Sequence, residues 1–254
     1  MLPGTEGGCG YRPPMTTTFD FAGALAQGLG SRNGAWEFLR AYAAHWADGL
    51  DENDGWREAD LDAAENRLGL RLPTALREAY RLFARREDLT GNHDRLLAPD
   101  ELHVDAAREA LVFRHENQGA ASWGILLETL HEEDPAVLVR ADLADRSAER
   151  WEPWTERFSA CCVELVLSES LLADSALCGF LYEPAEEDLR MLEETCLRLP
   201  SPDRPGEGSG PGMRWFLGQD VLVRDDGAGL LVRGLTPEAL VRFRDLTRGE
   251  WLEL

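Results

Sequence analysis

Lysine is absent from this chain of 254 residues, and all 26 of its basic residues are Arg. The absence excludes enzymes that depend on a lysine side chain, namely P-loop nucleotide hydrolases, Schiff-base and pyridoxal-phosphate enzymes, and serine–lysine hydrolases. Long apolar runs are also lacking. No window approaches the roughly 18 consecutive apolar residues of a membrane-spanning helix, and the N-terminus has no apolar signal core. We therefore expect a cytoplasmic protein.

Cysteine is scarce, and its count of five is odd. A chain of this length does not need a disulfide scaffold, and the later cysteines lack the C-x-x-C spacing of zinc sites. Cys161 and Cys162 are adjacent within an apolar stretch, which is typical of small buried residues. We expect no metal, no cofactor and no catalytic residue.

Two catalytic or metal-binding arrangements stay open as alternatives. Cys162 or Cys178 could pair with a histidine as a nucleophile. Separately, the histidines and one carboxylate of the central region could converge on a metal ion. The histidines of the first arrangement are His115 and His131, and the second uses His103, His115, His131 and Glu116.

Acidic residues dominate the charge, with 47 Asp and Glu and a formal net charge of −21. Nucleic-acid binding depends on neutralising phosphates with basic side chains, so we expect neither nucleic acid nor an anionic membrane as a partner. A strongly acidic protein attracts basic protein partners instead, although acidity also serves solubility alone. The sequence indicates no particular oligomeric state.

The acidic residues concentrate in two stretches. Residues 183–194 begin a predicted helix, where acidic side chains complement the helix dipole. Residues 48–65 hold eight acidic residues and one Arg, and much of this stretch precedes a helix as a loop. This second stretch is either solvated surface or a contact site for a basic partner.

The order of periodic segments predicts an α+β protein with a mainly antiparallel sheet. Helical periodicity in the first third gives way to alternating segments at 111–116 and 123–128, which predict a hairpin, and later to helices at 155–172 and from 184. We divide the chain into a disordered or loosely attached extension (1–34), an α+β domain (35–199), a Pro/Gly-rich linker loop (200–213) and a β-hairpin with a helix (214–254). The last segment either completes the core or lies outside the core sheet.

Three blocks between residues 55 and 172 resemble the SUKH superfamily, which contains a fungal cell-wall-synthesis regulator and many bacterial immunity proteins. The first block surrounds the Gly-x-x-Leu-Pro turn, the second is a strand pair, and the third is an Asp-Pro turn into a strand. The matching positions are Glu65, Gly69, Leu72, Pro73, Glu116, Gln118, Trp123, Gly124 and Pro135. The resemblance implies a single core with one curved antiparallel sheet and helices on one side, extended by the C-terminal hairpin and helix.

The resemblance also implies a non-enzymatic immunity protein that binds and neutralises a toxin domain. Many such toxins are nucleases, whose active clefts are basic because they hold polyanions. An acidic binder would match that charge, so we expect the contacts to involve first Asp51, Glu52, Asp54 and Glu58, and second Glu132, Glu133 and Asp134.

Two other functions stay open. One is an intracellular scaffold or regulator that shares the fold and binds an endogenous protein. The other is an enzyme or small-molecule-binding domain that uses His115, Glu116 and Asp134. Glu116, Gln118 and Asp134 match the family as polar residues near strand ends, where they either contact a ligand or hold a turn by hydrogen bonds.

Overall fold

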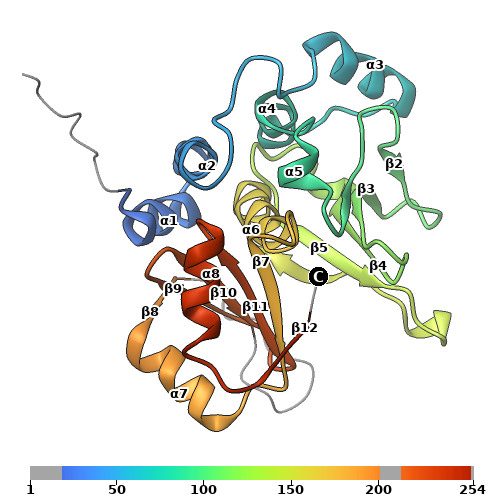
Figure 1. Ribbon diagram of the computed structural model, residues 1–254. Helices are drawn as coiled ribbons and strands as arrows, with labels where there is room; N and C mark the ends of the chain where they lie inside the picture. The colour runs from blue at the N-terminus through green and yellow to red at the C-terminus, as the bar shows by residue number, and fades with distance from the viewer. Residues whose placement is uncertain (1–18, 201–212, 253–254) are drawn as a thin grey trace, which may run out of the picture.

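The computed structural model describes residues 19–200 and 213–252. In these ranges the chain forms helices and two six-stranded antiparallel sheets, so the predicted α+β class is confirmed (Figure 1). The sequence predicted one sheet, whereas the structure divides the strands between two. No described helix is both long enough and apolar enough to cross a membrane.

The first sheet contains the predicted hairpin at its centre. Its strand order is β1-β3-β4-β5-β6, and β2 pairs with the same edge of β3 as β1 does. Alternation of apolar and polar side chains predicted the β3–β4 pair, which is interrupted by one irregularity between Val112 and Arg114. The strands are β1 (Arg95–Leu96), β2 (His103–Val104), β3 (Ala110–His115), β4 (Ala121–Leu126), β5 (Val137–Ala141) and β6 (Glu152–Thr155).

The second sheet contains the C-terminal hairpin, in the order β12-β7-β11-β10-β9-β8. The predicted strand 214–224 is two strands, because the chain reverses at Asp220, whose φ is 59°. Strand β7 was not predicted, yet it pairs with both β11 and β12. The strands are β7 (Cys178–Tyr182), β8 (Leu197–Arg198), β9 (Arg214–Gly218), β10 (Val221–Asp225), β11 (Gly229–Gly234) and β12 (Glu250–Leu252). The C-terminal segment therefore does not join the first sheet.

The helices begin and end at residues with clear local causes. Asp20, Ser31 and Thr236 each accept a backbone N–H bond at a helix start, and Gly69 ends α3 in the left-handed conformation. The helices are α1 (Phe21–Gly30), α2 (Arg32–Trp46), α3 (Glu58–Leu68), α4 (Thr74–Leu82), α5 (Glu87–Thr90), α6 (Phe158–Ser170), α7 (Glu186–Thr195) and α8 (Pro237–Arg244).

Helix α6 is the centre of the molecule. All of its residues are buried, and it packs against α1, α2, α4 and α5 (Figure 1). Phe158 at its start lies edge-on to Phe113 of the first sheet, and Ser168 near its end accepts a hydrogen bond from Arg224 of the second sheet. The helix is buried on all sides, including its Ser and Glu side chains, which therefore need partners within the core.

The prediction that residues 1–34 are loosely attached is wrong for the described part, residues 19–34. Phe21 and Leu25 of α1 are 3% and 2% exposed. The Phe21 ring makes edge-to-face contacts with Phe38, Tyr42 and Trp46 of α2. The apolar face of α1 is thus buried against α2 and α6, and the first domain includes it. Residues 1–18 and most of the predicted linker lie outside the described residues.

Candidate functional site

The loop before α3 presents two of the predicted contact residues. Asp51 and Glu52 are exposed, and neither forms an ion pair with any described residue. The loop around them is held in one conformation, because the Asp51 carboxylate accepts the N–H of Asn53 and the Asp54 carboxylate accepts the N–H of Asp51. These bonds form a short, closed turn that fixes where the two free carboxylates point.

Arg86 anchors this loop from beneath. Its guanidinium group donates to the carbonyl oxygens of Asp48 and Gly49 and to the carboxylates of Asp54 and Asp88. The hydrogen bonds to Asp88 and then Asp54 raise the pKa of Arg86 despite partial burial. The predicted contact residue Asp54 is therefore an anchor of the loop and already has a cationic partner.

Glu58 is also neutralised within the molecule. Its carboxylate bonds to Arg77 and lies 3.1 Å from Arg81, both on α4. Arg77 also contacts Asp62 at 2.8 Å and Glu65 at 3.0 Å, so one guanidinium group serves three carboxylates of α3. Arg77 and Arg81 are four positions apart on α4, and this spacing is a signal in the sequence that could have indicated a basic side of the helix.

The second predicted stretch, Glu132 to Asp134, likewise contains one carboxylate without an ion pair and two that have partners within the described residues. Glu132 is exposed and forms no ion pair with a described residue. Glu133 bonds to Arg32 at 2.9 Å. Asp134 is half-buried and accepts from the backbone N–H of Ser159 at 2.8 Å and from its hydroxyl at 2.6 Å, at the start of α6. Asp134 therefore holds a helix end.

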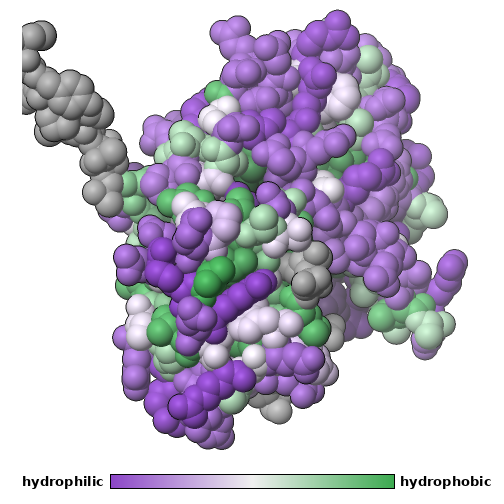
Figure 2. All heavy atoms as spheres, viewed as in Figure 1, coloured by the Kyte–Doolittle hydropathy of each residue, from purple (hydrophilic) through white to green (hydrophobic). Residues whose placement is uncertain are grey.

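Helix α4 lies between the two acidic stretches and is bonded to both. At its N-terminal end the N–H of Ala75 donates to the carbonyl of Glu133, and just past its C-terminal end the N–H of Arg85 donates to the carbonyl of Asp54. Figure 2 shows hydrophilic side chains over α3, α4 and α5 in the upper part of the view. This acidic face, defined by residues 48–54 and 132–134 with α4 between them, carries Arg as well as acidic side chains.

Two hollows border the acidic face. A polar groove of about 680 Å³ lies among α2, α3 and α4 and is lined by Trp36, Arg40, Glu58 and Glu78, among others. An apolar groove of about 790 Å³ runs along the edge strand β6. Its lining includes Thr129 and Ala136, which flank the acidic residues 132–134 on both sides.

The positions of the first block that resemble the SUKH superfamily stabilise the turn between α3 and α4. Glu65 is buried, where its carboxylate accepts the N–H of Leu72 at 2.9 Å and bonds to Arg71 at 2.9 Å, so it holds the turn between α3 and α4. Gly69 provides the left-handed end of α3. Leu72 and Pro73 are buried immediately before α4.

The motif residues of the second and third blocks have similar structural roles. Glu116 accepts the N–H groups of Gln118 at 2.8 Å and Ala120 at 2.9 Å, which closes the β3–β4 turn, while the Gln118 side chain is exposed. A Cβ at Gly124 would lie 2.9 Å from the Trp151 ring, so the strand needs glycine there. Trp123 and Pro135 are buried.

A buried ionic cluster lies between the first sheet and α6. Arg114 of β3 is 2% exposed, and its guanidinium group contacts the carboxylates of Asp94 at 2.7 Å, Glu169 at 3.2 Å and Glu164 at 3.5 Å. It also lies 4.3 Å from the centroid of the Trp123 ring. Burial lowers the pKa of Arg114, but the carboxylates of Glu164 and Asp94 outweigh it, and the pKa is raised overall.

The same cluster connects both sheets to α6. Arg224 of β10 donates to the Ser168 hydroxyl at 3.0 Å, and that hydroxyl donates to Glu164 at 2.8 Å. Glu169 accepts the N–H groups of His93 and Asp94 in the loop before β1. Burial raises the pKa of Glu169. Carboxylate and hydroxyl groups of one helix thus bind arginines from two sheets, a connection that sequence periodicity did not show.

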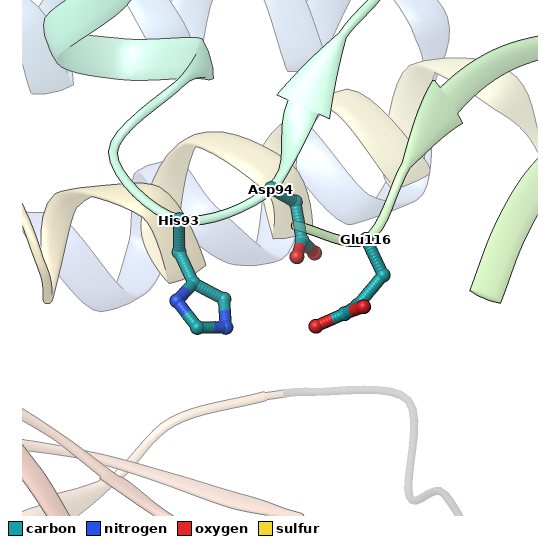
Figure 3. Close-up of side chains that lie close together, drawn as sticks. All are labelled: His93, Asp94 and Glu116. Atoms are coloured by element: carbon teal, nitrogen blue, oxygen red, sulfur yellow. The ribbon is translucent and has the colours of Figure 1, made fainter. Parts of the chain in front are cut away.

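At the edge of this cluster, His93, Asp94 and Glu116 point toward one another (Figure 3). One ring nitrogen of His93 and one oxygen of each carboxylate all lie within 4.8 Å of each other. The sequence pointed to Glu116 but missed His93 and Asp94. The pairing of Arg95 with His115 brings these segments together, and such long-range pairing leaves no local pattern.

The two arrangements left open in the sequence are not assembled in the described residues. His103 and His115 stack at 5.4 Å, while His131 bonds to the carbonyl of Glu128, so the alternative metal-binding set does not converge among the described residues. Cys162 is fully buried, and burial raises its pKa well above the usual range. A nucleophilic thiol requires a lowered pKa, so Cys162 lacks that activation.

The comparisons with known proteins gave no assignment: no family model, no curated protein and no solved structure matches this chain.

Proposed function

We propose that this chain is a non-enzymatic protein-binding module, an immunity-type protein that binds and neutralises a basic toxin domain through its acidic face. The observation that carries the proposal is the position of α4, which bonds to both acidic stretches at its two ends. A helix of nine residues is about 14 Å long, whereas a standard interface covers about 800 Å² on each partner. One partner can therefore cover both stretches.

The contact residues are the exposed carboxylates that no described Arg neutralises, Asp51, Glu52 and Glu132. The paired acids of the same stretches hold these three in place. A preorganised loop loses little conformational entropy on binding, and complementary charge speeds the encounter of the partners. The apolar groove beside residues 132–134 would supply the apolar centre that protein interfaces combine with a polar rim.

The partner class follows from charge. A nuclease-like domain must present a basic cleft to hold a polyanion, and an acidic face fits that cleft. The resemblance to the SUKH superfamily, with its bacterial immunity proteins, leads to the same partner independently of the charge. We propose that the binding takes place in a bacterial cytoplasm.

The test is co-expression of the full chain with a basic nuclease toxin domain encoded beside its gene, scored by cell survival and by the affinity of the purified complex. The test variant is Asp51→Arg with Glu52→Arg. The matched control is Glu187→Arg with Glu194→Arg, which changes the net charge equally at exposed positions of α7.

We expect the wild type and the α7 control to protect the cells. The loop variant should lose protection, and its complex should weaken and show a smaller salt dependence. Equal protection by both variants would exclude the acidic face as the contact site. Failure of the wild type to bind or protect would contradict the proposed function itself.

A further inference from the structure

The cluster of His93, Asp94 and Glu116 offers ligand atoms that the fold itself leaves unused. Asp94 is 7% exposed, and its Oδ2 bonds to Arg114 while its Oδ1 is buried without a hydrogen-bond partner in the described part of the chain. Burying a carboxylate oxygen without a partner is costly, so such an atom calls for a ligand. One carboxylate oxygen of Asp94 lies within 4.8 Å of the ligand atoms of both other residues.

The other two residues are positioned to complete a donor set. Glu116 uses Oε2 for the N–H groups of Gln118 and Ala120, so its second oxygen is available. His93 has Nδ1 at 3.2 Å from the Asn117 side-chain amide. The amide nitrogen Nδ2 of Asn117 faces Nδ1; with the amide turned over, its oxygen accepts Nδ1–H and Nε2 is the free nitrogen, an arrangement typical of metal-binding histidines. Figure 3 shows the His93 ring directed toward Glu116.

The surrounding charge favours a cation. The carboxylates of Asp94, Glu116, Glu164 and Glu169 outnumber the guanidinium groups of Arg114 and Arg224 at this junction. A divalent cation would offset that excess.

We propose that His93, Asp94 and Glu116 form a binding site for a divalent transition-metal cation of the zinc type. One imidazole nitrogen and two carboxylate oxygens suit Zn²⁺, whereas Ca²⁺ and Mg²⁺ prefer oxygen ligands alone. Ligands at Zn²⁺ distances lie about 3.4 Å apart, so the three side chains need to close by about 1 Å. His93 is exposed and Glu116 is half-buried, so both have room to move. A fourth position stays open to water.

The proposal is independent of the toxin-binding function and is tested on the full chain alone. Isothermal titration with Zn²⁺, with Mg²⁺ as the comparison ion, measures stoichiometry and affinity. The variants are His93→Ala and Glu116→Gln. Their matched controls are His131→Ala and Glu109→Gln, which change an exposed residue of the same type outside the cluster. Co²⁺ absorption separates nitrogen and oxygen ligation from binding to cysteine.

We expect one Zn²⁺ per chain and no comparable Mg²⁺ binding. Each cluster variant should weaken Zn²⁺ binding by more than the roughly 10–100-fold that loss of an outer partner costs, and neither control should change it. A hundredfold excess of Zn²⁺ over Kd should raise the Tm by about 5–10 °C in the wild type and the controls only. If Glu116→Gln fails to fold, the exposed His93→Ala variant decides. Absent Zn²⁺ binding, binding that both cluster variants retain, or a thiolate spectrum with Co²⁺ would each overturn the proposal.

Discussion

In both the acidic face and the buried ionic cluster, carboxylates surround arginine side chains, but the ion pairs have different roles in the two regions. At the acidic face, Arg77 and Arg86 lie near the surface and leave Asp51 and Glu52 free in solvent. In the buried cluster, Arg114 is enclosed by its carboxylates and supports the junction of two sheets with α6. Water screens the first set of charges and is excluded from the second. The same residue types therefore serve recognition in one region and cohesion in the other.

The largest effect is expected where the buried charges lose their cation. Arg114→Ala leaves Asp94, Glu164 and Glu169 in the interior without their shared partner. Removing one side of a buried ionic set costs about 3–5 kcal/mol of the free energy of unfolding. Urea denaturation of both proteins at neutral pH measures the difference. The control is Arg81→Ala, which removes an exposed partner of Glu58 and should cost less than about 1 kcal/mol. If Arg114→Ala and Arg81→Ala lowered the unfolding free energy equally, the buried and exposed ion pairs would not differ in their contribution to stability.

Asp105 is another buried carboxylate, and it allows the stability provided by a buried charge to be measured as a function of pH. Burial raises the pKa of Asp105, but hydrogen bonds from Ala110, Glu109 and Trp151 and the charge of Arg140 outweigh it, so its pKa is lowered overall. An acid whose pKa is lower in the folded state stabilises the protein above the unfolded pKa, near 4, and this contribution is lost as pH falls through the folded pKa.

Asp105→Asn should therefore cost about 1.5–3 kcal/mol at pH 7, because the charged hydrogen bonds are lost. The difference between the wild type and the variant should shrink as the pH falls below about 4 and disappear only below the lowered folded pKa of Asp105. Unfolding free energies measured from pH 3 to 7 provide the check. For Glu169, whose pKa is raised by burial, the sign is opposite: its contribution is present at low pH and is lost as pH rises through the folded pKa. If the loss of unfolding free energy in Asp105→Asn did not change with pH, the lowered pKa of Asp105 would be contradicted.

A smaller effect is expected at the anchor of the acidic loop. Arg86→Ala removes the donor to Asp48, Gly49 and Asp54, so the loop should gain motion. We expect a loss of about 1 kcal/mol in stability, since the side chain is only partly enclosed. Hydrogen exchange of residues 48–54 should accelerate while that of α6 does not change. Unchanged exchange in the loop would show that the turn is held without Arg86.

The smallest effect on stability is expected at the free carboxylates themselves. Asp51→Asn retains the oxygen that accepts the Asn53 N–H and removes only a charge in solvent. Its unfolding free energy should stay within about 0.5 kcal/mol of the wild type. Thermal and urea denaturation measure this directly. A larger loss would mean that Asp51 supports the fold and is not a free contact residue.

Local patterns predicted much of the fold. Alternation over 111–128 located the β3–β4 hairpin, and the Gly69 and Leu72-Pro73 signals located the boundary between α3 and α4. The short strand β7 and the split of 214–224 were missed, because five-residue strands in a mixed apolar context carry little periodicity. The attachment of α1 was missed because its apolar face becomes evident only when α2 and α6 cover it.

The net charge of this protein, its α+β class and the positions of its two acidic stretches can be read from the sequence alone. They depend only on residue type and local spacing. Only the tertiary structure decided which carboxylates stay free. Asp51, Glu52 and Glu132 have no ion-pair partner in residues 19–200 and 213–252, while Glu58 and Asp54 bond to arginines 19 to 32 positions away. Likewise, only strand pairing placed His93 and Asp94 beside Glu116. Pairing partners are set by packing between distant segments, and no local spacing specifies them.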